Sequence, residues 1–315
     1  MQLDRQKFKC YHIFVIKDLI IIGAGPAGIT AAVYAARKKL NFSVLTKDIG
    51  GQAAWSGDIE NYTGYQFITG PDLALKFKEH LEKFEFDLQE GIGVNKIERN
   101  NQLFDVITSR SERFSTKTVV VASGKSPRFL NVPGEIEYKN RGITYCATCD
   151  GPIFSNKVVA VIGGGNSALD AALQMIRIAS RVYLINITDK LTGDPAMQEK
   201  IIAAKNVEIL NNTKVLEIYG GKFVRGMKVE TMGKVREIQL EGVFVEIGSV
   251  PNSDIIDFVD KNQFQEIVVN CTNETSVPGV FAAGDVTNVP EKQIIVAAGE
   301  GAKATLAAFR YLSTH

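Results

Sequence analysis

Long hydrophobic runs are absent from this chain. The longest apolar stretches, such as 19–22 and 158–162, fall far short of the roughly 18 residues that a membrane-spanning helix needs. We therefore expect no membrane helix. The apolar run at 11–16 is short, is followed by Lys17 and lacks a small-residue cleavage site, so we interpret it as an extension leading into a strand rather than a targeting signal.

An excess of charge of one sign is also absent. The chain has 36 Lys plus Arg against 35 Asp plus Glu, which gives a formal net charge of +1. Proteins that bind nucleic acids or acidic membranes usually show a clear excess of basic residues. We therefore expect neither a nucleic acid nor a membrane among the partners.

Cysteine and histidine are scarce, with four cysteines and three histidines in 315 residues. Four cysteines in a chain of this length do not make a disulfide framework, and a CxxC pair beside α/β patterning indicates redox or metal chemistry. A zinc site would need two more ligands besides Cys146 and Cys149. The remaining cysteines are isolated in sequence, which favours redox chemistry, although spacing alone leaves zinc open. A reducing cytoplasm is the compartment we expect.

The chain does contain the same pattern of strand, glycine turn, helix and strand twice. These segments lie at 18–22, 23–28, 29–37 and 42–45 in the first unit, and at 158–162, 163–165, 167–178 and 182–185 in the second. The chain also exceeds the roughly 100–200 residues that are usual for one domain. The pattern predicts an α/β protein with two Rossmann-like, three-layer nucleotide-binding domains, the second inserted in the first.

The predicted domain boundaries follow from the position of the second unit. A buried-looking strand at 119–121 precedes it, and a strand at 280–283 and a helix at 293–312 follow it. A terminal strand and helix usually return to complete a sheet. We therefore expect residues 1–123 and 249–315 to form one discontinuous domain, and residues 124–248 to form the inserted one.

The first glycine turn has the spacing of a dinucleotide site. Its first glycine permits the turn, its second lets a pyrophosphate approach the backbone, and its third allows close packing of helix on strand. The predicted cofactor contacts here are Gly23, Gly25, Pro26, Ala27 and Gly28. The acid after the second strand, Asp48, comes late for a residue that binds an NAD ribose, which mildly weakens NAD as the ligand of this unit.

The second glycine turn is a GxGxxA variant and suits a second dinucleotide. The predicted nicotinamide-nucleotide contacts are Gly163, Gly165, Asn166, Ser167 and Asn186. Asn186, at the end of the following strand, can hydrogen-bond a ribose hydroxyl but cannot pair with a 2′-phosphate as arginine does. These residues favour NADH over NADPH. The alternative is a second unit that keeps this fold but binds no nucleotide.

Cys146 and Cys149 are the predicted chemical centre. Two thiols at this spacing can form a disulfide, and a CxxC at the start of a helix gains a lowered thiolate pKa. Asp150 follows directly and is placed to shuttle a proton as the thiols form or react. We therefore predict Cys146, Cys149 and Asp150 as catalytic residues, with no metal.

Taken together, the motifs resemble the low-molecular-weight thioredoxin reductases, and even more the flavoprotein portion of alkyl hydroperoxide reductase. The resemblance covers about residues 18–313. Its motifs are GAGPAG at 23–28, GGQ at 50–52, IENYTG at 59–64, CATCDGP at 146–152, GGGNSA at 163–168, FAAGDV at 281–286 and KQIIVAAGEGAKA at 292–304. The resemblance implies a homodimeric flavoprotein in which the inserted domain rotates to present the nicotinamide and the dithiol in turn to the flavin.

The resemblance also implies the residues around the flavin. Besides the first glycine turn, the FAD contacts that it implies are Gly51, Gln52, Asn61, Ser123, Gly124, Gly284, Asp285, Gln293 and Ile294. Asp285 would hydrogen-bond the ribitol, and Cys149 would be the thiol nearest the flavin. Cys146 would be its partner and Asp150 the acid–base.

The electron donor stays open between NADPH and NADH. Typical NADPH-using members carry a His-Arg-Arg motif and a further arginine where this chain reads NITDKLT at 186–192, and the NADH-using relative has Glu where this chain has Asn186. A non-nicotinamide donor such as reduced ferredoxin is the alternative. Only 17 residues precede the first expected strand, so an external protein should accept the electrons. We expect a thioredoxin-disulfide reductase that serves thioredoxin, a glutaredoxin-like protein or a peroxiredoxin.

Overall fold

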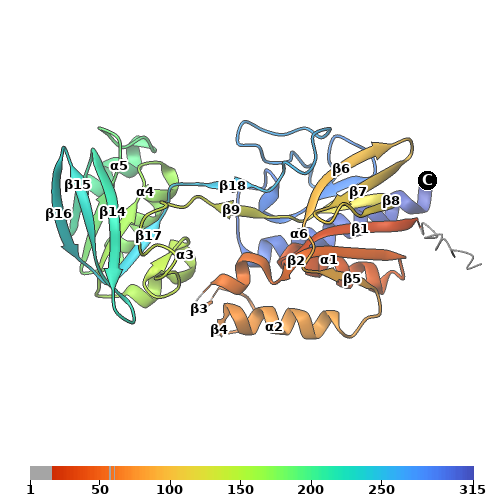
Figure 1. Ribbon diagram of the computed structural model, residues 1–315, viewed down its shortest axis with the longest axis horizontal. Helices are drawn as coiled ribbons and strands as arrows, with labels where there is room; N and C mark the ends of the chain where they lie inside the picture. The colour runs from red at the N-terminus through yellow and green to blue at the C-terminus, as the bar shows by residue number, and fades with distance from the viewer. Residues whose placement is uncertain (1–15, 57, 60) are drawn as a thin grey trace, which may run out of the picture.

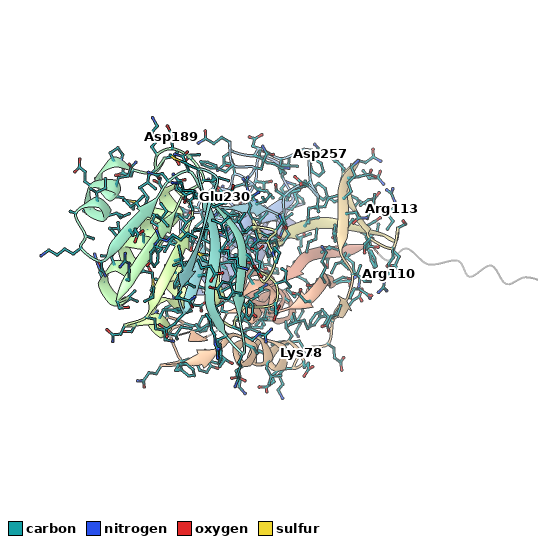
Figure 2. The ribbon with its side chains drawn as sticks, turned by 60° about the vertical axis from the view of Figure 1, so that its left-hand side comes forward. Lys78, Arg110, Arg113, Asp189, Glu230 and Asp257 are labelled. Carbon is teal, nitrogen blue, oxygen red and sulfur yellow. A yellow bond between two sulfur atoms is a disulfide. The ribbon has the colours of Figure 1, made fainter. Side chains whose placement is uncertain are left out.

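The computed structural model describes residues 16–56, 58–59 and 61–315, and it shows two lobes joined by two extended strands (Figure 1). Residues 11–15 of the predicted N-terminal extension at 11–16 lie outside the described residues. Charged side chains of both signs are spread over the surface, as the labelled Lys78, Arg113 and Asp189 illustrate (Figure 2).

The first lobe is built on a seven-stranded sheet. Its strands, in spatial order, are β5 (Asp87–Glu90), β2 (Phe42–Ile49), β1 (Lys17–Ala24), β8 (Arg113–Val121), β7 (Leu103–Thr108) and β6 (Val94–Asn100), with β19 (Val280–Ala282) also paired to β8. The pairs among β1, β2, β5, β8 and β19 are parallel, whereas β6 and β7 pair antiparallel. Other elements here are η1 (Gly51–Trp55), β3 (Asp58–Ile59), β4 (Ile68–Thr69), α2 (Gly70–Leu81) and η3 (Gly284–Val286).

Strand β1 is apolar on both faces because both faces are covered. Leu19 and Ile21 pack into the core formed with α1 (Pro26–Arg37) and α6 (Ile294–Thr314). Ile20 and Ile22 belong to a second core on the opposite face, with side chains from β6 and β7 and from the segment before β19. The alanine-rich sequences of α1 and α6 let these two helices pack closely against each other and against the sheet.

The second lobe has a five-stranded parallel sheet covered on both faces. Its strands, in spatial order, are β10 (Ile143–Thr144), β17 (Gly242–Val245), β11 (Val158–Ile162), β12 (Arg181–Ile185) and β13 (Val207–Leu210). One face packs on α4 (Asn166–Ile178), beside α3 (Ala147–Asp150), η2 (Gly151–Phe154) and α5 (Pro195–Ile202). The other face packs on the antiparallel sheet of β14 (Thr213–Gly220), β15 (Val224–Thr231) and β16 (Lys234–Gln239).

The strands of the second sheet all lie between β8 and β19 in the chain, so the second lobe is inserted in the first. The two crossings are β9 (Lys125–Pro127) and β18 (Ser249–Pro251), which pair antiparallel. Figure 1 shows them running side by side between the lobes. The strands and helices predicted in both βαβ units are confirmed, although α1 begins at Pro26 rather than at Ile29.

Candidate functional site

A cavity of about 650 Å³ lies where the first lobe meets the second. Every residue predicted to contact FAD lines it except Gly28. The three predicted catalytic residues, Cys146, Cys149 and Asp150, line the same cavity although they come from the other lobe. The sequence motifs that lie far apart in the chain are therefore brought together at one place.

The first glycine turn has the geometry that a bound pyrophosphate requires. Gly23 has a φ of +98°, in the left-handed region, and a Cβ there would lie 2.4 Å from the Ala122 carbonyl oxygen. A Cβ on Gly28 would lie 1.9 Å from the Gly23 carbonyl oxygen, which accounts for the absence of Gly28 from the cavity wall. Gly25, by contrast, faces open space, and no side chain caps the start of α1. The N–H groups at the start of this helix, which no side chain caps, are thus available to an anionic group.

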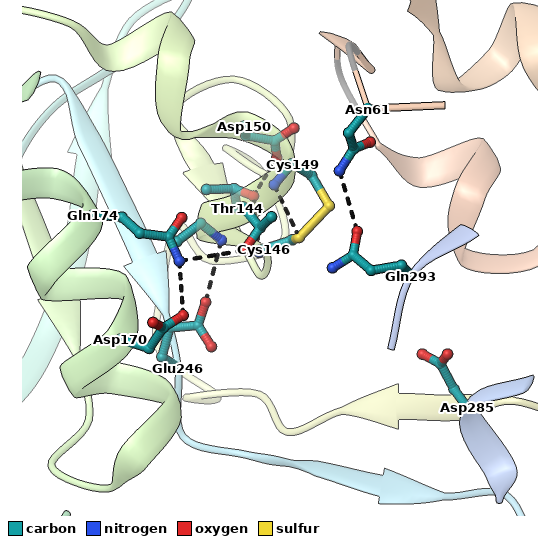
Figure 3. Close-up of a disulfide and its surroundings, with 12 residues drawn as sticks. Asn61, Thr144, Cys146, Cys149, Asp150, Asp170, Gln174, Glu246, Asp285 and Gln293 are labelled. Carbon is teal, nitrogen blue, oxygen red and sulfur yellow. Dashed lines mark hydrogen bonds between the residues drawn. A yellow bond between two sulfur atoms is a disulfide. The ribbon is translucent and has the colours of Figure 1, made fainter. Parts of the chain in front are cut away.

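Cys146 and Cys149 form a disulfide, with their Cα atoms 5.3 Å apart. Cys146 caps the single turn of α3, and its sulfur accepts a hydrogen bond from the Cys149 N–H at 3.2 Å. Figure 3 shows the disulfide pointing toward Asn61 and Gln293, whose side chains hydrogen-bond to each other at 3.1 Å. The sulfur atoms therefore face the residues predicted to surround the flavin.

Asp150 is buried at the end of α3 and is linked to the dithiol through Thr144. The Thr144 hydroxyl donates to the Asp150 carboxylate, and the same hydroxyl oxygen accepts from the Cys146 N–H at 3.2 Å. Thr144, which sequence reasoning missed, thus connects the predicted acid–base to the backbone of the cysteine.

Asp285 lies on the opposite wall of the first cavity. Its carboxylate is 3.8 Å from the Lys125 ammonium, and burial raises its pKa while Lys125 and Lys292 oppose that rise. Lys125 belongs to β9, and its carbonyl accepts a hydrogen bond from the side chain of Gln52. The crossing strand is thereby tied to two of the predicted flavin contacts.

A second cavity of about 630 Å³ opens at the carboxyl ends of the second sheet. All five residues predicted to contact the nicotinamide nucleotide line it, and Gly165 faces open space at the start of α4. Parallel sheets bind ligands at this edge of the strands.

Asn186 lines this cavity, but its amide is already bonded within the protein. The side chain is only 3% exposed. Its Nδ2 donates to the Thr188 and Lys190 carbonyls at 3.2 and 2.9 Å and to Asn211 Oδ1 at 3.1 Å. Its Oδ1 accepts from the Thr188 hydroxyl at 3.0 Å. Asn186 therefore orders the loop at 187–193, and its predicted contact with a ribose stays a prediction.

Glu246, which sequence reasoning also missed, lies between the two cavities. It follows β17 directly and lines the second cavity, and its carboxylate accepts from the Ala147 N–H at 3.4 Å. Burial raises its pKa to about 7, partly opposed by the Ala147 N–H and Lys125, while Asp170 adds to the rise. The sequence feature that could have identified Glu246 is an acid directly after the apolar sequence GVFV at 242–245.

Metal centres and membrane-spanning helices are two other features that a redox protein can carry. Within 16–56, 58–59 and 61–315, no group of three or more His, Cys, Asp or Glu side chains could hold a metal ion. No helix in that part of the chain is long and apolar enough to span a bilayer. Cys271 is an exposed free thiol, whereas Cys10 lies outside the described residues.

Two nucleotide-type cavities and a cysteine pair that lines one of them define a two-lobed oxidoreductase. The chain belongs to the pyridine nucleotide-disulphide oxidoreductase family, whose model matches residues 17–301. It is 40% identical over 298 residues to the F component of the alkyl hydroperoxide reductase of Staphylococcus aureus (strain MSSA476), covering 94% of this chain and 59% of the relative. The chain thus spans little more than half the length of that curated relative.

Two solved structures complete the comparison. A thioredoxin reductase from Streptococcus pyogenes MGAS5005 superposes with a TM-score of 0.90 at 36% identity, covering 96% of this chain and 100% of that one. A Lactococcus lactis thioredoxin reductase, described as being in the FR conformation, gives 0.67 at 34% identity, with 95% and 100% covered. These findings confirm the predicted resemblance and the α/β fold with two Rossmann-like domains.

Membership in this family implies FAD and NAD(P)H as cofactors. The observed residues fit two dinucleotides, because each glycine turn leaves one glycine, Gly25 or Gly165, facing open space at the start of a helix without a side-chain cap. The fit is weaker at the strand end of the second turn, where the Asn186 amide already has partners.

Proposed function

We propose that the protein is an FAD-dependent disulfide reductase that passes electrons from a nicotinamide donor, NADPH or NADH, to the Cys146–Cys149 disulfide and on to a protein acceptor. One observation carries this proposal: the disulfide lines the same cavity as the residues predicted to hold FAD. FAD, when bound, supplies the two-electron chemistry that links a nicotinamide to a disulfide.

The protein's own residues divide the remaining work. Cys149 would be the thiol nearest a bound flavin, with Cys146 as its partner. Asp150 holds the proton that one thiol gains or loses, and the Thr144 hydroxyl orients its carboxylate through the observed hydrogen bond. The first glycine turn, with Gly51, Gln52, Asn61, Asp285 and Gln293, binds FAD.

The two lobes act as domains, 1–123 with 249–315 and 124–248, and the second turns about β9 and β18. Two relatives of similar identity support this division, because the S. pyogenes enzyme superposes at 0.90 and the L. lactis enzyme, in its named conformation, at only 0.67. Such a turn would bring the second cavity to the flavin in place of the dithiol.

The acceptor is a small redox protein, either a thioredoxin-like protein or a peroxiredoxin. The names of the relatives support both, since one is a thioredoxin reductase and the other a component of alkyl hydroperoxide reductase. A homodimer in a reducing cytoplasm completes the proposal, and a dithiol that must cycle through its reduced form suits that compartment.

Anaerobic stopped-flow of the purified protein tests the donor and the dithiol together. NADH or NADPH should bleach the flavin absorbance band, and addition of oxidised thioredoxin or peroxiredoxin should restore it. A Cys149→Ser variant should still be bleached by the donor but should no longer reduce the protein acceptor. Reduction of the acceptor at the normal rate by this variant would contradict the proposal.

A second candidate keeps the flavin and the dithiol but uses a reduced ferredoxin as donor. The bonds of Asn186 favour it, because the donor and the acceptor of this amide already have partners within the loop. Bleaching by reduced ferredoxin, with no bleaching by either nicotinamide, would select this candidate.

A further inference from the structure

Glu246 is placed where the second cavity meets the dithiol. Its backbone N–H donates to the Ile162 carbonyl at 2.8 Å, which fixes the residue at the carboxyl ends of β17 and β11. Its side chain reaches α3, where the carboxylate accepts from the Ala147 N–H at 3.4 Å. Figure 3 shows Glu246 on the side of α3 that faces away from Asn61 and Gln293. One side chain therefore contacts the cavity of the second glycine turn and the segment between the two cysteines.

The two residues between the cysteines are each held by a polar contact from the second lobe. Ala147 is held by Glu246, and the Thr148 hydroxyl accepts a hydrogen bond from Gln174 at 3.3 Å. Since α3 is a single turn, these contacts and the Thr144 hydroxyl help to hold Cys146 in place, together with the disulfide.

Charged groups from several elements face Glu246. Lys125 on β9 favours its ionised form, whereas burial and Asp170 on α4 favour its protonated form, so that its pKa rises to about 7. Asp150 lies at the other end of α3 and is bonded to Thr144. Glu246 therefore changes charge in the pH range in which an activated cysteine thiol also ionises. A carboxylate that is bonded to the residue next to Cys146 disfavours the Cys146 thiolate.

We propose that Glu246 is a positioning residue for the dithiol, which holds the first turn of α3 and sets the reactivity of Cys146 from the wall of the second cavity. This inference deepens the proposed function, since it rests on the dithiol as the redox centre.

The test follows the alkylation of Cys146 against pH in the flavin-containing protein after reduction with dithiothreitol. Iodoacetamide is the probe, and tandem mass spectrometry separates the labelling of Cys146 from that of Cys149. Glu246→Gln keeps an oxygen for the Ala147 N–H but removes the charge. We expect a broad profile in the parent protein, because two interacting groups titrate together. The variant should give a single-proton profile, with its midpoint lower by about one pH unit.

Glu241→Gln is the matched control. Glu241 lies just before β17, at the opposite end of that strand from Glu246, and its carboxylate accepts from the Val158 N–H at the same 3.4 Å, far from the dithiol. Its profile should equal that of the parent protein. A control that shifts as much as Glu246→Gln would overturn the proposal, because the effect would then follow from charge anywhere on the strand.

Glu246→Ala, which removes both the charge and the acceptor, separates the two roles. If Glu246→Gln matches the parent and only Glu246→Ala differs, Glu246 is merely structural and the proposal is wrong. A downward shift in both variants supports it. The assay uses neither a nicotinamide nor a protein acceptor, so failure of the proposed electron donor would leave its result intact.

Discussion

Replacing Asn186 with aspartate should destabilise the second lobe and should not improve the binding of NADH. The Asn186 side chain is 3% exposed, and its Nδ2 donates to two carbonyls and to the Asn211 side chain. Aspartate has the same shape but places a carboxylate oxygen against these three acceptors. The two N–H groups of Nδ2 are shared among these three acceptors, so at about 1 kcal/mol net for each lost N–H donor the cost is about 2 kcal/mol, before charge repulsion adds to it.

The sequence pattern alone predicts the opposite result. An acid at the end of the second strand of a Rossmann unit takes the ribose hydroxyls of NAD, so Asn186→Asp should tighten NADH binding. Thermal unfolding and calorimetric titration with NADH distinguish the two. We expect the melting temperature to fall by about 10 °C. The fall should be larger at pH 8 than at pH 5, because burial raises the pKa of the new carboxyl and its stable, protonated form is lost as the pH rises.

Ile187→Glu is the control for this experiment. Ile187 is the next residue and is 70% exposed, so the same charge can be introduced there without breaking the bonds of Asn186. Its melting temperature should stay within about 1 °C of the parent value. An Asn186→Asp protein with an unchanged melting temperature and tighter NADH binding would show that the side chain is free to turn to the ribose.

Three further outcomes are expected. Gly25→Ala should fold with unchanged apoprotein stability but bind less FAD, measured as the flavin-to-protein ratio, because Gly25 has a φ of −74° and faces open space. Gly28→Ala should lose about 3 kcal/mol or more in unfolding measurements, because its Cβ would meet a backbone oxygen at 1.9 Å. The unfolding free energy of the parent protein, relative to that of Glu246→Gln, should fall by about 2–3 kcal/mol from pH 5 to pH 8. The reason is that an acid whose pKa is raised to about 7 stabilises the folded state below its ordinary pKa and loses that contribution as the pH rises.

Most of the fold could be predicted because its strongest signals are local. The apolar strands β1 and β11 are each followed by a glycine turn and an alanine-rich helix, and both βαβ units are where the sequence places them. The antiparallel strands β14–β16 were not predicted. Their sequence alternates between residues that pack on the parallel sheet and charged residues that face outward, as at Met227 and Lys228, and such a short alternation gives a weak signal.

The first cavity was predictable for a different reason. Part of its wall is formed by the first glycine turn, whose backbone geometry is determined by glycine spacing, as at Gly23 and Gly25. The dithiol was likewise predictable because two cysteines at this spacing need only one helical turn to meet. Thr144 was not, because its role depends on a side-chain bond to a residue six positions away.

The second cavity shows where spacing stops being informative. Asn186 and Glu246 both follow buried parallel strands, and both therefore lie at the same edge of the sheet. Their side chains nevertheless have different partners. The loop at 187–193 folds back on the second glycine turn, where the Thr192 and Gly193 N–H groups donate to the Gly164 carbonyl, and this leaves the Asn186 amide bonded to the loop.

Glu246 has no such loop to bond, so its carboxylate turns to the helix that carries the cysteines. The fate of each strand-end side chain thus depends on the length and path of the next loop, which residue type and periodicity do not determine. Swapping the loop at 187–193 for a shorter one should therefore free a side chain at 186 for the ribose while leaving the Glu246 contact with Ala147 unchanged. Loss of that contact, measured as a changed alkylation profile of Cys146, would mean that the two strand ends are coupled.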